Sequence, residues 1–565
     1  MRLLRGIFAG VVSLPGAVVA VPGRAAARRR SLPAGPALGN GLALLVLAAL
    51  AAWLLPLQGD FALLPVPAAR DLSAAGAILV AYAGLLLAFR PRREGGVAAR
   101  TDGATTLLVA HASQTGFAEE LAARTATLVR GSGRSVRVVA LGELDAAGLA
   151  AAGELLIIAS TTGDGDAPDS AMAFVCDVLG RKTDLRPLRY GLLALGDSSY
   201  RHYCAFGRQL DAWLRESGAA PLFEPIEVDD GDEEALVRWQ LDVARLAATT
   251  APDAWREPEF SNWRLAERRL LNPGSEGGPC FHLALVPQAG GLPAWQAGDI
   301  AVIQPRHARA AVEGWLAEVA MDGAATVAVS GGSFTLRELA ARSQLPPAED
   351  CRGRLPADIA RLLRPLASRE YSIASLPQDE AIQLLVRQVR GTDGSLGVGT
   401  GWLTEHAEVG AEIILRVRSN ANFHGPPDAR PLILIGNGSG MAGLRALLKQ
   451  RVAAGQRRNW MLFGERCADC DFYYAEDIRR WQAEGFVDRL DLAFSRDEPA
   501  RVYVQDRLRA AAPMLRAWVD AGASIYVCGS LAGMAPGVEE VLVESLGRAG
   551  LDRLIAERRY RRDVY

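Results

Sequence analysis

The chain has 565 residues, half of them apolar and 22% charged, and its formal net charge is −2 at pH 7. This length exceeds what one hydrophobic core accommodates, so about three or four domains are expected. The near-zero charge, without a recurring basic block in the soluble part, gives no reason to expect nucleic-acid binding. Seven scattered cysteines, an odd number, argue against a disulfide framework and favour a reducing compartment.

Residues 1–95 differ from the rest and predict a membrane anchor. Transmembrane helices are predicted at about 39–57 and 74–90, over runs that are apolar and uncharged as far as Phe89. Arginines precede the first run and follow the second, so the positive-inside rule places both flanks in the cytoplasm. This predicts an inner-membrane protein whose later domains face the cytoplasm. Two buried core helices are the alternative, and residues 1–38 have no predicted role beyond an interfacial or loosely ordered arm.

Three polar, glycine-containing loops each follow a predicted strand in the next part of the chain. The strands are predicted at 106–110, 155–158 and 192–195, and the loops at 113–118, 160–166 and 196–204. The first loop, SQTGFA, presents hydroxyls and backbone N–H groups at a helix start, which suits a phosphate without a basic residue. Alone it is also an ordinary helix cap. Three such loops at one sheet edge predict a ligand site in a doubly wound fold.

The sequence pattern changes after a polar linker at 251–263. From there on it predicts strands with alternating apolar and polar residues, such as 281–286 and 300–303. Helical patterns fill 307–366. The segment Arg369–Ser375 follows, in which an arginine fork can neutralise a pyrophosphate and a tyrosine two residues on lies on the same strand face. A second phosphate loop at the start of a helix is predicted at 397–400.

A third unit begins with the strand 431–435, which runs into the glycine-rich turn 436–440 and a helix. Such a turn lets backbone N–H groups meet a dinucleotide pyrophosphate. Two guanidiniums and a hydroxyl, in Ser495-Arg496 and Arg501-Val502-Tyr503, favour a phosphate over a bare ribose. A further strand at 525–527 ends at Cys528-Gly529. The last residues, RYRRDVY, end the chain on Tyr565; a frayed terminus is the alternative.

Together these motifs resemble the diflavin reductases over about residues 105–565. The resemblance implies an α/β fold: a flavodoxin-like, doubly wound FMN domain at 105–247; a ferredoxin-reductase-like FAD domain at 258–425, an antiparallel barrel with a reduced connecting insert at about 307–366; and a Rossmann-like NADPH domain at 430–565. The implied cofactors are FMN, FAD and NADPH. Thr162, Ala297, Thr400 and Asn437 depart from the family's usual residues.

The resemblance also implies roles for individual residues. Hydride transfer involves Ser372, Cys528, Asp563 and Tyr565, whose ring covers the FAD. The FMN residues are Ser113, Gln114, Thr115, Gly116, Phe117, Ala118, Ser160, Thr161, Thr162, Gly163, Leu195, Gly196, Asp197, Ser198, Ser199, Tyr200, Tyr203 and Cys204. The FAD residues are Arg369, Glu370, Tyr371, Ser372, Gly397, Val398, Gly399, Thr400 and Tyr565. The NADP residues are Gly436, Gly438, Ser439, Gly440, Ser495, Arg496, Arg501, Tyr503, Gln505, Cys528 and Gly529.

The implied function is NADPH-dependent electron transfer through FAD and FMN to a one-electron acceptor, a haemoprotein or a ferric chelate. One alternative is the flavoprotein subunit of an assimilatory sulfite reductase; an alternative of another class is a flavin-binding sensory or interaction module without turnover. Acidic loops at 164–169 and 229–234 predict a docking face for the acceptor protein. No metal site is predicted, since the CxxC at Cys467 and Cys470 lacks a second ligand pair.

Overall fold

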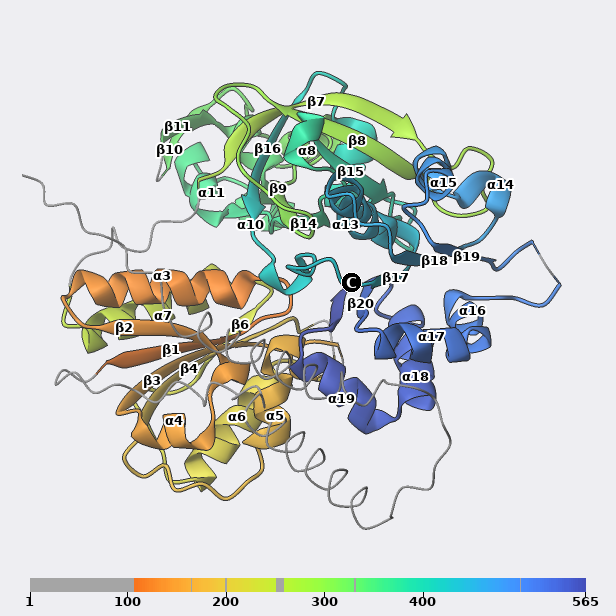
Figure 1. Cartoon of the computed structure of the whole chain (residues 1–565). Helices are drawn as coiled ribbons and strands as arrows, with labels where there is room; N and C mark the ends of the chain where they lie inside the picture. The colour runs from red at the N-terminus through yellow and green to blue at the C-terminus, as the bar shows by residue number, and fades with distance from the viewer. Residues whose placement is uncertain (1–105, 164, 199–200, 250–258, 330–331, 498) are drawn as a thin grey trace, which may run out of the picture. The chain divides into compact units, whose positions relative to one another are not determined.

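The computed structural model describes residues 106–565 except 164, 199–200, 250–258, 330–331 and 498. The chain divides into two compact units, 1–92 and 93–565, so all described residues belong to the second. The description below runs through that unit in chain order (Figure 1).

The first part is a parallel sheet with strand order β2-β1-β3-β4-β5, and β6 also pairs with β4. The strands are β1 (Leu107–Ala112), β2 (Val136–Ala140), β3 (Glu154–Ser160), β4 (Arg189–Gly196), β5 (Ala220–Pro221) and β6 (Ile226–Asp229). Helices α3 (Phe117–Gly131) and α7 (Glu233–Leu246) pack on one face. Helices α4 (Ala146–Ala151), α5 (Met172–Asp177) and α6 (Ala205–Glu216) pack on the other.

The second part is an antiparallel sheet with strand order β14-β9-β16-β7-β8-β15. Its strands are β7 (Ser261–Leu270), β8 (Cys280–Pro287), β9 (Ile300–Gln304), β14 (Arg369–Ser372), β15 (Ile382–Arg387) and β16 (Glu412–Arg418). Alternate side chains, including Trp263, Leu285 and Ile303, meet in one buried core, as expected for a sheet with a single apolar face. We call this part the FAD barrel, after the domain that the sequence led us to expect here. Short helical turns at α12 (Val398–Gly401) and η6 (Trp402–His406) follow β15.

The segment between β9 and β14, expected to be helical, also contains strands. Its helices are α8 (Arg309–Glu318), α9 (Leu336–Ala341), α10 (Ala348–Cys351) and α11 (Pro356–Leu362). Two antiparallel pairs join them, β10 (Thr326–Val329) with β11 (Gly332–Thr335) and β12 (Ser343–Gln344) with β13 (Arg364–Pro365). The segment has its own core around Trp315 and Ile359. The β-branched run at 326–329 explains the first hairpin.

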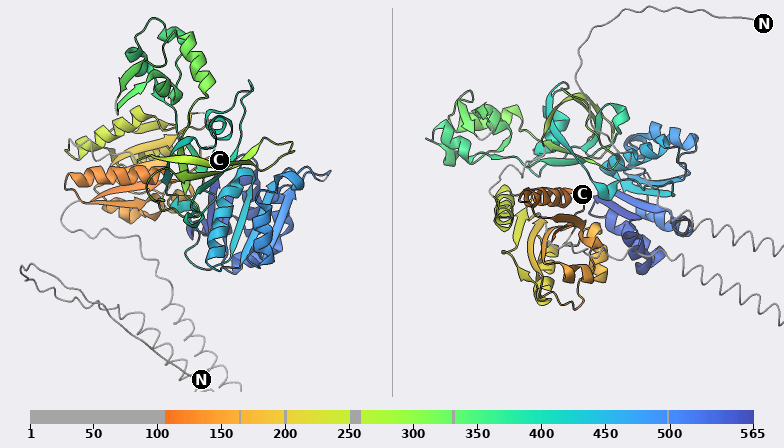
Figure 2. Two further views of the ribbon diagram at one scale, coloured as in Figure 1. Left: turned by 90° about the horizontal axis from the view of Figure 1, so that it is seen from above. Right: turned by 60° about the vertical axis from the view of Figure 1, so that its left-hand side comes forward.

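The third part is a five-stranded parallel sheet with strand order β19-β18-β17-β20-β21. Its strands are β17 (Leu432–Asn437), β18 (Asn459–Glu465), β19 (Arg489–Phe494), β20 (Ser524–Gly529) and β21 (Tyr560–Val564). Its helices are α13 (Met441–Ala453), α14 (Ala468–Asp471), α15 (Ala475–Ala483), α16 (Val504–Ala510), α17 (Ala512–Asp520), α18 (Met534–Leu546) and α19 (Arg548–Ala556). We call this part the nucleotide domain, and Figure 2 shows its helices on both sides of the sheet.

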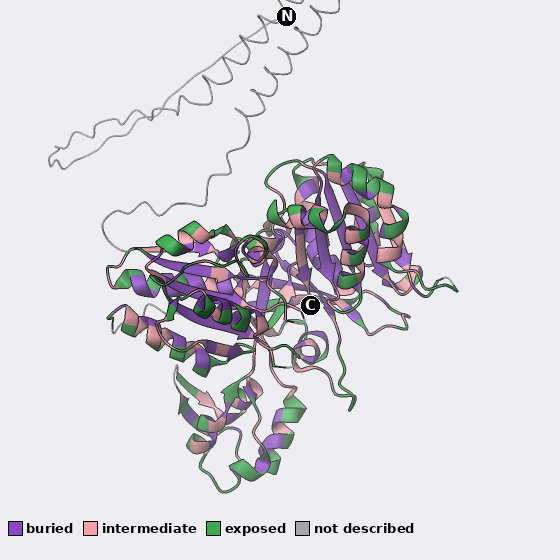
Figure 3. Cartoon of the chain, turned by 90° about the horizontal axis from the view of Figure 1, so that it is seen from below, coloured by how far each residue is buried: buried purple, intermediate pink, exposed green. Residues whose placement is uncertain are grey.

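The burial pattern explains why the strands were recognisable in the sequence. The inner strands of the two parallel sheets are buried on both faces, whereas the covering helices expose one side (Figure 3). Strands of that kind read as continuous apolar runs.

The end of the chain is ordered, because β21 pairs in parallel with β20 from Tyr560 to Val564. The alternative prediction of a frayed C-terminal tail is therefore wrong.

The predicted inner-membrane location is wrong on the structural findings. It required membrane-spanning helices, and across the described residues no helix combines the length and apolar character that a bilayer crossing demands. The anchor at 1–95 and its two helices at 39–57 and 74–90 lie outside the described residues. The prediction depended wholly on apolar runs flanked by arginines.

Candidate active site and cofactor-binding loops

Three predicted catalytic side chains meet where the FAD barrel contacts the nucleotide domain. Ser372, at the end of β14, donates a hydrogen bond from its hydroxyl to Asp563 Oδ2 over 2.7 Å. The thiol of Cys528 lies 3.7 Å from the same oxygen. Cys528 in β20 faces Asp563 in β21 because these two strands pair in parallel at that register. The sheet thus brings Cys528 and Asp563 together, and the hydrogen bond from Ser372 joins them to the FAD barrel.

Burial controls the protonation of this cluster. Removal from water raises the pKa of Asp563, against the lowering effect of hydrogen bonds from Ser372 and Cys528. Burial also raises the pKa of the Cys528 thiol well above its ordinary value, and the neighbouring Asp563 adds to the effect. Cys528 therefore stays protonated and acts as a neutral donor. The cluster contains no activated nucleophile, in keeping with chemistry carried by cofactors.

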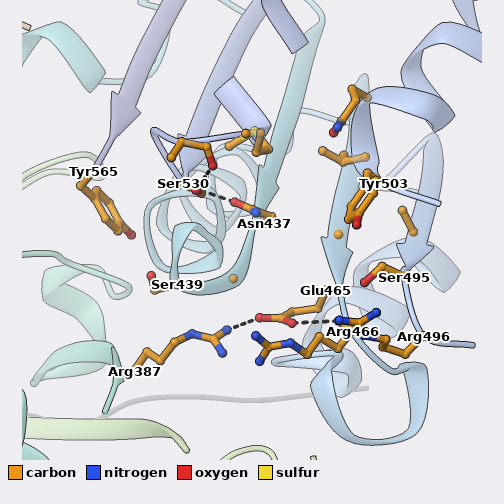
Figure 4. Close-up of a pocket in the computed structure, with 18 residues that line it drawn as sticks. Arg387, Asn437, Ser439, Glu465, Arg466, Ser495, Arg496, Tyr503, Ser530 and Tyr565 are labelled. Atoms are coloured by element: carbon orange, nitrogen blue, oxygen red, sulfur yellow. Dashed lines mark hydrogen bonds and ion pairs between the residues drawn. The ribbon is translucent and has the colours of Figure 1, made fainter. Parts of the chain in front are cut away.

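Tyr565 is anchored through its backbone while its ring stays accessible. Its N–H donates to the Gly529 carbonyl and its own carbonyl accepts from the Leu531 N–H, both at 3.0 Å. The residue is 53% exposed. Its ring lines a cavity beside Ser439 and Ser530 (Figure 4). A side chain with a fixed backbone and a half-exposed ring can change position without disturbing β21.

The cavity beside Tyr565 has a volume of about 680 Å³ and gathers most of the predicted NADP residues. Gly438, Ser439, Ser495, Arg496, Tyr503 and Gln505 all line it. They come from the turn after β17, the end of β19 and the start of α16, which lie at the carboxyl edge of the sheet. Ligands of open α/β sheets bind at this edge. Figure 4 shows these side chains around one space.

The other predicted NADP residues shape the turn or lie outside the cavity lining. A Cβ on Gly440 would lie 2.1 Å from the Cys528 carbonyl oxygen, so only glycine lets the turn pack on β20. Gly529 has φ +131, and a Cβ at this position would collide with Asn437. The Asn437 side chain accepts from the Ser530 N–H over 2.9 Å, which ties the two loops together. Arg501 is exposed and lies outside the lining.

Sequence reasoning missed three charged residues of the cavity: Arg387, Glu465 and Arg466. Glu465 and Arg466 come at the end of β18, next to β17, and this position was a signal that could have found them. Arg387 belongs to β15 of the FAD barrel, and nothing local in its sequence indicates a nucleotide. One nitrogen of Arg466 is buried without a partner in the described protein. An unsatisfied guanidinium in a cavity fits an anionic ligand.

The two predicted FAD elements lie against each other. A Cβ on Gly399 would lie 2.6 Å from Arg369 Cγ and 3.2 Å from the Tyr371 hydroxyl oxygen, so the 397–400 loop packs on β14. Burial raises the pKa of Tyr371. Thr400 accepts a hydrogen bond from the Val389 N–H over 3.2 Å. Glu370 points elsewhere and forms an ion pair with Arg418. The buried indole N–H of Trp402, in the adjoining turn, has no partner among the described groups, which fits a polar ligand.

The predicted FMN loops occupy the carboxyl edge of the first sheet. The Thr161 N–H donates to the Leu195 carbonyl over 2.9 Å, which joins the loop after β3 to the end of β4. In the first loop the Gly116 N–H donates to Ser113 Oγ over 2.9 Å, and Gly116 has φ +88. The hydroxyls of Thr161 and Thr162 are buried without partners in the described protein. Unsatisfied hydroxyls at this edge fit the polar atoms of a flavin nucleotide.

Some predicted FMN residues have other contacts or cannot be placed. Cys204 is buried and its thiol donates to the Ala194 carbonyl over 3.4 Å, inside the sheet core rather than in the loop. Ser199 and Tyr200 lie outside the described residues. Arg418 Nη2 donates to the Thr115 hydroxyl over 3.4 Å. The first predicted FMN loop therefore has a basic neighbour that the sequence did not indicate, supplied by the FAD barrel.

Comparisons with known proteins agree with this arrangement. A family model described as flavodoxin matches residues 109–239, and one described as oxidoreductase NAD-binding domain matches 434–540. A protein of Yersinia enterocolitica named sulfite reductase [NADPH] flavoprotein alpha-component is 30% identical over 82% of this chain and 90% of its own length. The chain belongs to the diflavin reductase family. Proteins with the same name from Neisseria meningitidis and Vibrio vulnificus are 30% and 28% identical, over 81% and 83% of this chain and 89% and 88% of their own lengths.

Membership of this family confirms several predictions from the sequence. As a diflavin reductase the protein is an NADPH-dependent flavoprotein oxidoreductase with FMN, FAD and NADPH as its cofactors. Its flavodoxin-like and nucleotide-binding parts are the folds that were expected. An electron-acceptor partner is part of the family's chemistry. Membership of an enzyme family leaves no support for the alternative prediction, a flavin-binding sensory or interaction module without turnover.

Proposed function

We propose that this diflavin reductase oxidises NADPH at Ser372, Cys528 and Asp563 and delivers electrons one at a time to a haemoprotein. The supporting observation is the position of this buried cluster next to Tyr565, which lines the cavity that also contains the glycine turn. When bound, the nicotinamide and flavins supply the redox chemistry, and the protein supplies alignment and exclusion of water.

The cluster orients rather than reacts. The carboxylate of Asp563 fixes the Ser372 hydroxyl at 2.7 Å and lies 3.7 Å from the Cys528 sulfur, so both donors have defined directions. Their burial excludes water from the place where hydride would move. Tyr565 covers this place from the cavity side, and its ring must move for a nicotinamide ring to take its position.

The choice of NADPH over NADH is assigned to Ser495, Arg496 and Tyr503. All three line the cavity at the end away from Tyr565 (Figure 4). A guanidinium with two hydroxyls satisfies a phosphate better than a ribose hydroxyl. Arg501 is given a secondary, long-range role because it is exposed.

The flavin sites follow the same reasoning. FMN is assigned to the loops at 113–118, 160–163 and 195–204, and FAD to Arg369, Tyr371 and the loop 397–400. The proposed domain limits are 105–247 for FMN, 258–425 for FAD and 430–565 for NADPH.

Steady-state kinetics on the purified full-length protein test the main proposal. We expect FMN and FAD in equal amounts and rapid NADPH-dependent reduction of ferricyanide and cytochrome c, with NADH far less effective. Absence of NADPH oxidation in protein that contains both flavins would disprove the proposal.

A second, more specific function is favoured by the comparisons. Relatives named as the flavoprotein component of NADPH sulfite reductase align with most of this chain. We therefore propose sulfite reduction as the first activity to test, with the haemoprotein of such a reductase as acceptor. The assay mixes the two proteins with NADPH and sulfite and measures sulfide; no sulfide, with ferricyanide reduction intact, would direct the search to other haemoproteins.

The acidic residues at the end of β6 and in the turn after it are proposed as the acceptor's docking face. Two of them already have structural roles: Asp229 accepts from the Ser198 N–H over 2.7 Å and Asp232 caps α7 by accepting from the Glu234 N–H over 3.0 Å. Burial, with help from Asp197, raises the pKa of Asp230. A basic partner would relieve this charge crowding and associate faster. Glu233→Gln should slow reduction of the acceptor protein at low salt but leave ferricyanide reduction unchanged; equal rates would disprove the docking role.

A further inference from the structure

Arg387 reaches from the FAD barrel into the nucleotide cavity. It is the last residue of β15, paired with Cys280 of β8, and yet it lines the cavity whose other walls belong to the nucleotide domain. A Cβ built on Gly438, in the glycine turn, would lie 3.5 Å from Arg387 Nη2. Figure 4 shows the side chain directed toward the space between Ser439 and Glu465.

The guanidinium is held in place by two groups of the nucleotide domain. Its Nη2 forms an ion pair with Glu465 and donates to the Tyr473 hydroxyl over 3.1 Å. The Glu465 side chain is 8% exposed and also accepts from the Arg466 N–H over 2.8 Å. Although burial lowers the pKa of Arg387, Tyr473 and Glu465 outweigh it, and the net shift is upward. Arg387 is thus a fixed, permanent cation.

Two nitrogen atoms of the Arg387 side chain are available to bind an anion in the cavity. Within the described part of the chain both hydrogen bonds of Arg387 use Nη2, which leaves Nε and Nη1 for a ligand. The cavity lining carries Arg387, Arg466 and Arg496 against Glu465, a surplus of positive charge. The nearby turn Gly438–Gly440 precedes helix α13, and such turns receive the pyrophosphate of a dinucleotide.

We propose that Arg387 binds the pyrophosphate of NADPH, with Glu465 as its positioning residue, so that barrel and nucleotide domain grip the same molecule. The inference rests on the proposed function, because it places the nucleotide in this cavity. It assigns the two phosphate sites of NADPH to different parts of the chain: Arg496 recognises the 2′-phosphate and Arg387 the pyrophosphate. The competing explanation is that Arg387 and Glu465 only tie the two parts together.

Two ligands separate these explanations in the holoenzyme. NADP⁺ contains both phosphate groups, whereas 2′-AMP contains only the 2′-phosphate. Arg387→Met should raise the dissociation constant for NADP⁺ by about 10- to 100-fold, as loss of a charge-assisted contact predicts, and change that for 2′-AMP by less than about twofold. Arg496→Met should weaken both ligands.

The variants are chosen so that a folding defect is not mistaken for a binding defect. Arg387→Met leaves Glu465 buried without its partner, so the double variant Arg387→Met/Glu465→Gln removes that charge as well. Lys449→Met is the matched control, because Lys449 forms another barrel-to-nucleotide-domain ion pair, with Asp379, that is not part of the cavity lining. Flavin content is measured for each variant.

Isothermal titration of the holoenzyme then decides. Weaker NADP⁺ binding in both Arg387 variants, with 2′-AMP and Lys449→Met unaffected, supports the proposal. Unchanged NADP⁺ affinity, an equal loss for 2′-AMP, or the same loss in Lys449→Met overturns it. If the unaltered protein binds neither ligand, the proposed nucleotide site itself is wrong, an outcome distinct from failure of Arg387 alone.

Discussion

Ser372 and Asp563 are joined by a 2.7 Å hydrogen bond although 191 residues separate them in the chain. The bond connects β14 of the FAD barrel to β21, the last strand of the nucleotide domain. A single buried contact thereby links the proposed flavin site to the chain terminus that carries Tyr565.

Replacing Ser372 with alanine should slow reduction of FAD by NADPH about 10²-fold, the low end for a positioned proton-sharing group. The reason is that the hydrogen bond from Ser372 to Asp563 fixes the position of the hydroxyl beside the proposed flavin site. Stopped-flow absorbance under anaerobic conditions measures the rate. Ser375→Ala is the control, because Ser375 is also buried but donates to the Ala381 carbonyl. Equal rates in the two variants would remove Ser372 from the mechanism.

Asp563 should couple activity to pH. Since burial raises its pKa, the carboxylate is protonated at a higher pH than an ordinary aspartate, and the alignment of Ser372 and Cys528 is lost as pH falls. The rate of flavin reduction should decline on the acid side. The Asp563→Asn variant should reduce the flavin slowly, at a rate that does not change with pH in that range. A raised folded pKa also makes ionisation unfavourable for stability above the unfolded pKa. Asp563→Asn should therefore raise Tm at neutral pH, and a lower Tm would contradict this account.

Removal of the terminal ring should change nucleotide selection. With Tyr565→Ala the nicotinamide no longer displaces a ring, so NADH should become a better substrate relative to NADPH, while FMN content stays constant. The ratio of kcat/KM for the two nucleotides measures this. Tyr565→Trp keeps an aromatic cover and should preserve discrimination. Unchanged discrimination between NADPH and NADH in the alanine variant would mean that Tyr565 has no part in nucleotide selection.

Local patterns explain what the sequence predicted well. The strands before the cofactor loops are continuous apolar runs, and the turns after them need glycine or hydroxyl side chains for reasons that act within a few residues. Ser113, Gly116, Ser439 and Gly440 were identifiable on that basis.

Arg387 and Arg418 were missed for the opposite reason. Each is an arginine at the end of a barrel strand that extends into a loop of another part of the chain. Their positions depend on how separate sheets pack, which no local pattern encodes. For Cys204 the motif position suggested a loop residue, whereas packing of the core determines the contact of its thiol, which donates to the Ala194 carbonyl.

The choice between NADPH and NADH should depend on Arg496 more than on Arg501. Arg496 lines the cavity, whereas Arg501 is exposed outside its lining. Arg496→Met should raise KM for NADPH about 10- to 100-fold, the range for a lost charge-assisted hydrogen bond, and leave KM for NADH unchanged. Arg501→Met, the matched variant, should have a smaller effect that disappears in high salt. A larger effect at Arg501 would reverse the assignment.

His282 should make the folded protein sensitive to acid. Burial lowers its pKa to about 4, and its Nδ1 lies 2.9 Å from the Tyr474 hydroxyl oxygen. Because the unfolded chain binds a proton near pH 6.5 and the folded chain does not, unfolding is favoured increasingly from pH 6.5 down to about 4. Each pH unit in that window costs up to about 1.4 kcal/mol. Urea unfolding across this range should show a flatter pH dependence for His282→Gln than for the unaltered protein. Parallel curves would mean that His282 keeps its ordinary pKa in the fold.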